Sequence, residues 1–330
     1  MLTAIDEKNR LVNLLESSPE ELTGQYFCPA CKTEVVLKNG NIKITHFAHK
    51  TLRNCESWTE NESVQHLTLK KLLYRWFKKS EKVEVEKYLP ALNQTPDLLV
   101  NDNIAIEVQC SLLSLKRLKE RTENYQTHGY SVIWLMGKKL WLGHQLTELQ
   151  KNLMYFSENR GFYFWELDLE RKKLRLKSLI HQDLRGNILH LTEEILFGHG
   201  ELLAQLRRPF SAQAPLSLSV STDRGLAHFV RQQLFHRSTK WLEIQEKYYQ
   251  QGKNLLTENF DKPYIAPPGL NLLSFSTDKF SSANFTQITQ NITPYYQNFL
   301  ENFKKNPQNK LYPPRFYAII KEVNNETKAK

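Results

Sequence analysis

The sequence predicts an α/β chain in three parts, which are a small β-rich module, an α/β core and a mainly helical C-terminal region. Residues 62–136 show helical and strand periodicities in the order helix, three strands, helix, strand. Before them, short alternating segments and closely spaced cysteines and histidines indicate a small module that binds a metal. A chain of 330 residues suits two domains and an appendage. We place the parts at 1–56, 57–148 and 149–330.

The first part is expected to consist of short strands and turns. Residues Val35–Thr45 alternate in polarity about Asn39-Gly40, a dipeptide that favours a hairpin turn. Such a hairpin returns the chain after Thr45 toward the residues that precede Val35. We therefore expect side chains on either side of the hairpin to meet.

Five residues of types that bind Zn²⁺ flank this hairpin, and they are Cys28, Cys31, His46, His49 and Cys55. Zinc in a structural site takes four such ligands in a tetrahedron. The set that we favour is Cys28, Cys31, His49 and Cys55, with His46 as the alternative. The module then resembles a zinc ribbon, and the ion stabilises a domain with little core of its own. The other interpretation is a chance Cys-x2-Cys pair and two surface histidines.

The second part begins with a helix predicted over 62–79, where apolar residues recur at helical spacing. Three strands are predicted next, at 82–89, 95–100 and 104–110. A second helix at 114–128, a strand at 131–136 and a short strand at 139–142 follow. Gly129 ends the second helix. The strand at 131–136 is apolar from Val132 to Met136 and is expected to be buried.

The third part is basic and carries fewer signals. We predict a hairpin of residues 162–168 and 173–179. Helices are predicted at 192–207, 223–256 and 295–304, with a long loop at 257–290. No catalytic motif is found beyond residue 150.

The composition favours a polyanion as partner and the cytoplasm as compartment. The formal net charge is +10, and a basic surface attracts nucleic acids. No segment approaches the roughly 18–20 apolar residues needed to cross a bilayer. The N-terminus lacks the basic and apolar regions of a signal peptide. No glycine-rich phosphate-binding motif occurs, which argues against a nucleotide-driven motor.

Acidic residues on two neighbouring strands predict a site for Mg²⁺ or Mn²⁺. In the strand at 104–110, alternation places Glu107 and Gln109 on one face and apolar residues on the other. The preceding strand carries Asp97. If Val100 lies opposite Ile104, Asp97 lies opposite Glu107 on the same face. A two-residue turn would instead put Asp97 on the wrong face, so the site requires a connection of odd length, such as three residues.

The helix before these strands adds Glu62, His66 and Lys70, which share a face at spacings of four. Glu62 can serve as a third ligand of the ion, directly or through water. His66 or Lys70 can contact the scissile phosphate or orient the attacking water. The alternative for these three residues is a solvated helix face.

The second core helix presents Arg117, Arg121 and Tyr125 on one face, again at spacings of four. The two arginines can hold DNA phosphates beside the carboxylates. A solvated face paired with Glu120 and Glu123 is the other interpretation.

These motifs resemble a known family. Pro96-Asp97, nine residues, and then Glu107-Val108-Gln109 resemble the motif of PD-(D/E)XK nucleases, whose core has the predicted element order. More closely, the sequence resembles the competence protein CoiA family of Gram-positive bacteria. The segments that carry this likeness are Phe27-Cys-Pro-Ala-Cys31, His46-Phe-Ala-His49, Glu62-Ser63-Val-Gln-His66, Glu107-Val-Gln-Cys-Ser111, Arg121-x-x-x-Tyr125 and Val132-Ile-Trp134. The likeness covers residues 1–145 specifically.

The resemblance implies a restriction-endonuclease-like (PD-(D/E)XK) core and a role in DNA transformation. Such proteins act on incoming single-stranded DNA and support its recombination together with the RecA recombinase and its loading factors. It also implies that Asp97 and Glu107 bind Mg²⁺ or Mn²⁺, with Glu62 assisting.

One position departs from the nuclease pattern, because Gln109 stands where the motif usually has lysine. An amide can orient water but does not supply positive charge, which Lys70 would then have to provide. Three functions therefore stay open: a metal-dependent DNA nuclease, a catalytically weak DNA-binding factor that helps load RecA, and a zinc-stabilised protein-interaction scaffold.

Overall fold

The fold is described from a computed structural model. It describes residues 1–40, 44–50, 62–212, 214, 216–270, 273, 285–303 and 309–319. These form two compact units. The first unit comprises residues 1–141, 165–175 and 194–208, and the second comprises 142–164, 176–193 and 209–330.

The N-terminal module is a five-stranded sheet in the order β2-β1-β3-β4-β5. Its strands are β1 Thr3–Asp6, β2 Leu11–Asn13, β3 Tyr26–Phe27, β4 Glu34–Lys38 and β5 His46–His49. The predicted hairpin exists, but the tight turn at Asn39-Gly40 is wrong, because Lys38 pairs with His46. This register buries Phe47 against Tyr26, with ring centroids 5.1 Å apart. Burial of that aromatic pair favours the longer connection over the two-residue turn.

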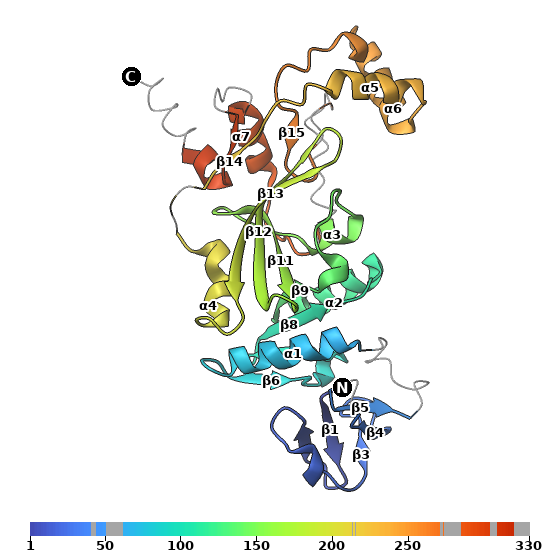
Figure 1. The fold of residues 1–330 in the computed structure, drawn as a ribbon, viewed down its shortest axis with the longest axis vertical. Coiled ribbons are helices and arrows are strands. Elements are labelled where there is room, and N and C mark those ends of the chain that lie inside the picture. Colours follow the sequence, from blue (N-terminus) through green and yellow to red (C-terminus); the bar gives the residue numbers. More distant parts are fainter. Residues whose placement is uncertain are drawn as a thin grey trace. The chain divides into compact units, whose positions relative to one another are not determined.

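The core shows the predicted order of helix, three strands, helix and strand. Its elements are α1 Val64–Phe77, β6 Val83–Val85, β7 Leu98–Val100, β8 Ile104–Gln109, α2 Leu115–Thr127 and β9 Ser131–Met136. Helix α1 packs on β6, β7 and β8, and α2 packs on β9 (Figure 1). The short strand predicted at 139–142 is wrong, because Lys138–Leu140 form a 3₁₀ turn closed by the Leu140 amide and the Gly137 carbonyl.

The main sheet has the strand order β13-β12-β11-β9-β8-β7-β6. Strands β6, β7 and β8 are antiparallel neighbours, whereas β9 runs parallel to β8. Strand β8 is therefore central, and all six of its residues are buried. A central strand can place polar side chains deep in the protein, provided that other groups satisfy them.

The sequence predicts a mainly helical C-terminal part, and this prediction is wrong. The C-terminal part mixes strands and helices. Its strands are β10 Tyr155–Ser157, β11 Gly161–Asp168, β12 Lys173–Asp183, β13 Ile188–Leu196, β14 Leu218–Ser219, β15 Ile265–Ala266 and β16 Lys310–Leu311. Its helices are α3 Glu148–Leu153, α4 Leu202–Arg207, α5 Leu226–Phe235, α6 Thr239–Gln250 and α7 Thr293–Phe303. The hairpin predicted at 162–179 is confirmed as β11 and β12. The helix predicted at 192–207 is wrong in its first half, because pairing of β13 beside β12 outweighs the local helical pattern.

Two serine caps fix the helices that carry the candidate site. The Ser63 hydroxyl accepts a hydrogen bond from the His66 amide at the start of α1, and Ser114 does the same for Arg117 in α2. These caps determine where each helix begins, and hence which residues face β7 and β8. Within the part of the chain that the structure describes, no helix combines the length and apolar character needed to span a bilayer.

Candidate active site

The pairing of β7 with β8 decides where the two acidic residues lie. Val100 lies opposite Ile104, and Leu98 lies opposite Ile106. The connection between the strands therefore has three residues, as the sequence analysis requires. Its Asn101 and Asp102 adopt the left-handed conformation that these residue types tolerate. Continuation of this register sets Asp97 opposite Glu107, and the Val108 amide donates to Asp97 Oδ2 at 2.8 Å.

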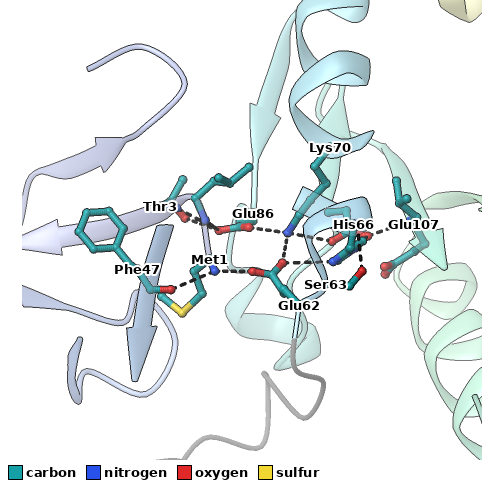
Figure 2. A network of polar contacts seen from close by, with 12 residues as sticks. Met1, Thr3, Phe47, Glu62, Ser63, His66, Lys70, Glu86 and Glu107 are labelled. Atoms are coloured by element: carbon teal, nitrogen blue, oxygen red, sulfur yellow. Dashed lines mark hydrogen bonds and ion pairs between the residues drawn. The ribbon is translucent and has the colours of Figure 1, made fainter. Parts of the chain in front are cut away.

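Glu62, His66 and Asp97 form a compact cluster between the start of α1 and the start of β7. One ligand atom from each lies within 4.8 Å of the others. His66 Nε2 is 3.0 Å from Asp97 Oδ2, and Nδ1 is 3.4 Å from Glu62 Oε1 (Figure 2). Two carboxylates and an imidazole are a donor set that suits Mn²⁺, and the carboxylates also suit Mg²⁺.

The ammonium of Lys70 lies among three carboxylates. It is 2.5 Å from Glu86 Oε1 and 3.2 Å from Asp97 Oδ1, and it also pairs with Glu62. The Lys70 side chain is 0% exposed. A cation enclosed in this way neutralises buried acids, and a DNA phosphate cannot reach it from solvent.

The cluster shifts the acid–base properties of its members. Burial alone would raise the pKa of Glu62, but Lys70, the Met1 amino group and His66 outweigh burial and hold that pKa well below its usual value. Burial also opposes ionisation of Asp97, yet His66 and Lys70 lower its pKa. Both acids are therefore ionised near neutral pH and able to bind a cation.

The pKa of His66 provides the first prediction. Burial alone would lower it, but Asp97 and Glu62 raise it to about 9. In protein kept free of divalent metal, we expect an NMR titration of the His66 ring with a midpoint near that value, assigned by its loss in His66→Gln. Protonated His66 then contributes stability fully below its unfolded pKa of about 6.5, and this contribution is lost as the pH rises through 9. A midpoint near 6.5 would contradict the geometry of the cluster.

Glu107 lies in a separate polar group formed with α2. Its Oε1 accepts from the Tyr125 hydroxyl at 2.6 Å and pairs with the Arg121 guanidinium. Burial raises the pKa of Glu107, and the Asp97 charge adds to this against the opposing effect of Arg121. Both contacts use Oε1, and Glu107 does not belong to the compact group formed by Glu62, His66 and Asp97.

Gln109 follows two residues later on β8 and is buried. Its Nε2 donates to the Ser111 carbonyl at 2.9 Å. This contact orients the amide with its nitrogen toward Ser111. An amide in this position carries no charge, in contrast with the lysine of the usual nuclease motif.

The three residues predicted to share a DNA-binding face on α2 have different environments. Tyr125 is fully buried and Arg121 pairs with Glu107. In contrast to the prediction, neither side chain presents a surface to DNA. Arg117 is half-buried at the first turn of α2. Of the three, Arg117 is the residue best placed to meet a phosphate.

The cysteine cluster of the N-terminal module is the second group that can hold a metal. Ligand atoms of Cys28, Cys31 and His49 lie within 4.8 Å of one another, and Cys31 Sγ is 3.3 Å from His49 Nε2. His46 is not in this group and contacts the Ile44 carbonyl. Cys55 lies outside the described residues. Two thiols and an imidazole that converge in this way fit three of the four ligands of Zn²⁺.

One residue of the site was missed by the sequence analysis. Glu86 follows β6, is 1% exposed and pairs with Lys70. The strand prediction had extended to residue 89, which would have made Glu86 an ordinary alternating position. The local signal is an acidic residue directly after Val85, the last residue of β6, and that signal is weak.

Comparison with known proteins finds two family models that match parts of the chain. The family model described as competence protein CoiA, nuclease-like domain, matches residues 62–196. The model described as competence protein CoiA, N-terminal domain, matches residues 13–57. Competence protein CoiA of Bacillus subtilis (strain 168) is 35% identical over 117 residues, which are 34% of this chain and 31% of that protein. The match thus spans about a third of the relative's length. No solved structure matches the chain.

Proposed function

Because the chain belongs to the competence protein CoiA family, we propose that it processes incoming DNA during transformation by metal-dependent phosphodiester hydrolysis and supports recombination of that DNA. The core is then of the restriction-endonuclease-like PD-(D/E)XK type. The observation that carries this proposal is the β7–β8 register, which sets Asp97 opposite Glu107. Its support is the partly buried Glu62 and His66 beside the buried Asp97.

A bound Mg²⁺ or Mn²⁺ would lower the pKa of a water molecule and stabilise negative charge on the reacting phosphate. Glu62, Asp97 and Glu107 would supply carboxylate oxygens to hold it. His66 lies within hydrogen-bond distance of Asp97 and, with its raised pKa, is the group that can hold a proton at Nε2. Gln109 would be the residue of the motif that orients the attacking water through its amide.

The N-terminal module is proposed to bind one structural Zn²⁺ through Cys28, Cys31, His49 and Cys55. The convergence of the first three side chains supports this set over one that contains His46. Zinc would stabilise a module whose buried cluster is small. The buried members of that cluster are Met1, Ala4, Tyr26, Cys28, Val35 and Phe47.

A second function is a catalytically weak DNA-binding factor that helps load the RecA recombinase onto single-stranded DNA. The observation that favours it is the environment of Lys70, which is enclosed among carboxylates, together with Gln109 at the position where the motif usually has lysine. In either case the compartment we propose is the cytoplasm.

Cleavage of labelled single- and double-stranded DNA with Mg²⁺, Mn²⁺ or EDTA separates the two functions. The nuclease proposal expects products that require metal. Binding of single-stranded DNA without any cleavage under these conditions would overturn hydrolysis and leave the loading factor, for which stimulated RecA filament formation is the next measurement.

Arg117→Glu is expected to weaken binding of single-stranded DNA about tenfold at low salt and to reduce the salt dependence of binding, because one phosphate contact is lost. Lys119→Glu is a matched control with the same change in charge. Lys119 lies two positions along α2, on another face, and pairs with Glu123. Fluorescence anisotropy over a salt series measures both. Equal effects of the two variants would show that only net charge matters.

A further inference from the structure

Glu86 joins the N-terminal module to the candidate metal ligands. It follows β6 with a backbone φ of +51°, a left-handed conformation that is uncommon for a side chain of this type. Its Oε2 accepts from the Leu2 amide at 2.6 Å, the Thr3 amide at 3.0 Å and the Thr3 hydroxyl at 3.2 Å. Its Oε1 pairs with Lys70 at 2.5 Å (Figure 2). The two oxygens of one buried carboxylate thus serve two different parts of the protein.

The contacts on Oε2 fix where this carboxylate lies. Three donors come from two consecutive residues of the module, and Thr3 begins strand β1. The Glu86 amide also donates to the Asp97 carbonyl at 3.1 Å, which ties its backbone to the start of β7. Glu86 is therefore held from both sides, and its position does not depend on Lys70 alone.

Lys70 is shared between Glu86 and the acids that would bind the metal. Its ammonium contacts Glu62 Oε1 and Asp97 Oδ1 on one side and Glu86 Oε1 on the other. A divalent cation at Glu62 and Asp97 must compete with this ammonium for the same carboxylate oxygens. Negative charge on Glu86 attracts the Lys70 ammonium, which then neutralises Glu62 and Asp97 less.

We propose that Glu86 is a positioning residue that sets the divalent-metal affinity of Glu62 and Asp97, by drawing the Lys70 ammonium toward itself from a position fixed by strand β1. This inference rests on the proposed metal-dependent function. Glu86 is not a ligand in this account, and it acts through Lys70. The N-terminal module thereby contributes to the metal site without touching the ion.

The test is direct binding of Mn²⁺ to the full chain by calorimetry or by electron paramagnetic resonance. Glu86→Gln keeps an oxygen acceptor for Leu2 and Thr3 but removes the charge that Lys70 faces. We expect its Mn²⁺ affinity to fall at least about tenfold. Without a charge at residue 86, the Lys70 ammonium pairs more strongly with Glu62 and Asp97 and competes with Mn²⁺ for them. Adding Lys70→Gln to this variant removes the competing cation and is expected to restore affinity to within about threefold of the wild type.

Glu84→Gln is the matched control. Glu84 lies on β6, two residues before Glu86, is partly exposed and pairs with Lys87, so neutralising it should leave Mn²⁺ affinity unchanged. Thermal unfolding shows whether each variant is folded. If Glu86→Gln does not fold, Glu86→Asp is used in its place. The shorter acid keeps the charge but places it farther from Lys70. We then expect a severalfold loss of Mn²⁺ affinity that Lys70→Gln reverses.

Three outcomes would overturn the inference. Wild-type affinity in folded Glu86→Gln would show that Glu86 does not influence the site. Weakened binding that Lys70→Gln fails to restore would show that Glu86 acts on the fold rather than through Lys70. Absence of Mn²⁺ binding by the wild type would remove the proposed metal site itself and this inference with it. The first two results leave the proposed function intact.

Discussion

Asp97→Asn is expected to lower the rate of metal-dependent DNA cleavage about a thousandfold or more. Asparagine has nearly the same size but lacks the negative charge that pairs with His66 and that would hold the proposed cation. A difference of this size corresponds to about 4 kcal/mol of transition-state stabilisation, which is within the range for a metal ligand. Initial rates on labelled DNA with Mn²⁺ or Mg²⁺ give the measurement.

Asp102→Asn is the control for this substitution. Asp102 belongs to the same β-hairpin but is exposed and pairs with Lys82, so its neutralisation should leave the rate unchanged. Thermal unfolding and DNA binding of both variants show whether the fold and the DNA contact are retained. Cleavage by folded Asp97→Asn at the wild-type rate would place the catalytic centre elsewhere in the chain.

Cys28→Ser is expected to abolish binding of the proposed zinc ion and to unfold the N-terminal module. A structural zinc ion contributes apparent binding energy on the order of 10 kcal/mol, whereas this module has a small buried cluster to stabilise it. Zinc content should fall from about one ion per chain to near zero. Hydrogen exchange in β3 and β4, which flank the cysteine turn, should accelerate strongly.

Cys110→Ala removes a thiol outside this cluster and serves as the control. Cys110 is buried at the end of β8, where a side chain at Gly137 would approach its Sγ to 2.6 Å. The variant should keep its zinc and lose only the small packing contribution of the sulfur. Full zinc content in Cys28→Ser, or no zinc in the wild type, would contradict the proposed structural ion.

Much of the core could be predicted from the sequence, because its signals are local. Periodicity gives α1, α2 and β9, and alternation in β8 separates Glu107 from its apolar neighbours. To place Asp97 and Glu107 on the same face, the connection between β7 and β8 must also have an odd length. Asn101 and Asp102 satisfy this requirement because both tolerate the left-handed backbone of a three-residue connection.

The parts that could not be predicted depend on contacts between distant residues. Glu86 reaches Leu2 and Lys70 only after the module and the core have packed together. Arg121 and Tyr125 have the spacing of an exposed helix face, yet they turn toward the buried charge of Glu107. Strand β13 carries a helical pattern that pairing with β12 overrides. These contacts join residues far apart in the chain, so local sequence patterns do not predict them.

The central claim is that Glu62, Asp97 and Glu107 bind a catalytic divalent cation. A crystal grown or soaked with Mn²⁺ tests it most directly, through anomalous scattering at the manganese edge. We expect a peak bound by Asp97, Glu62 and Glu107, with Lys70 still in contact with Glu86. A crystal at saturating Mn²⁺ that has no peak at these residues, or a peak bound elsewhere, would contradict the account.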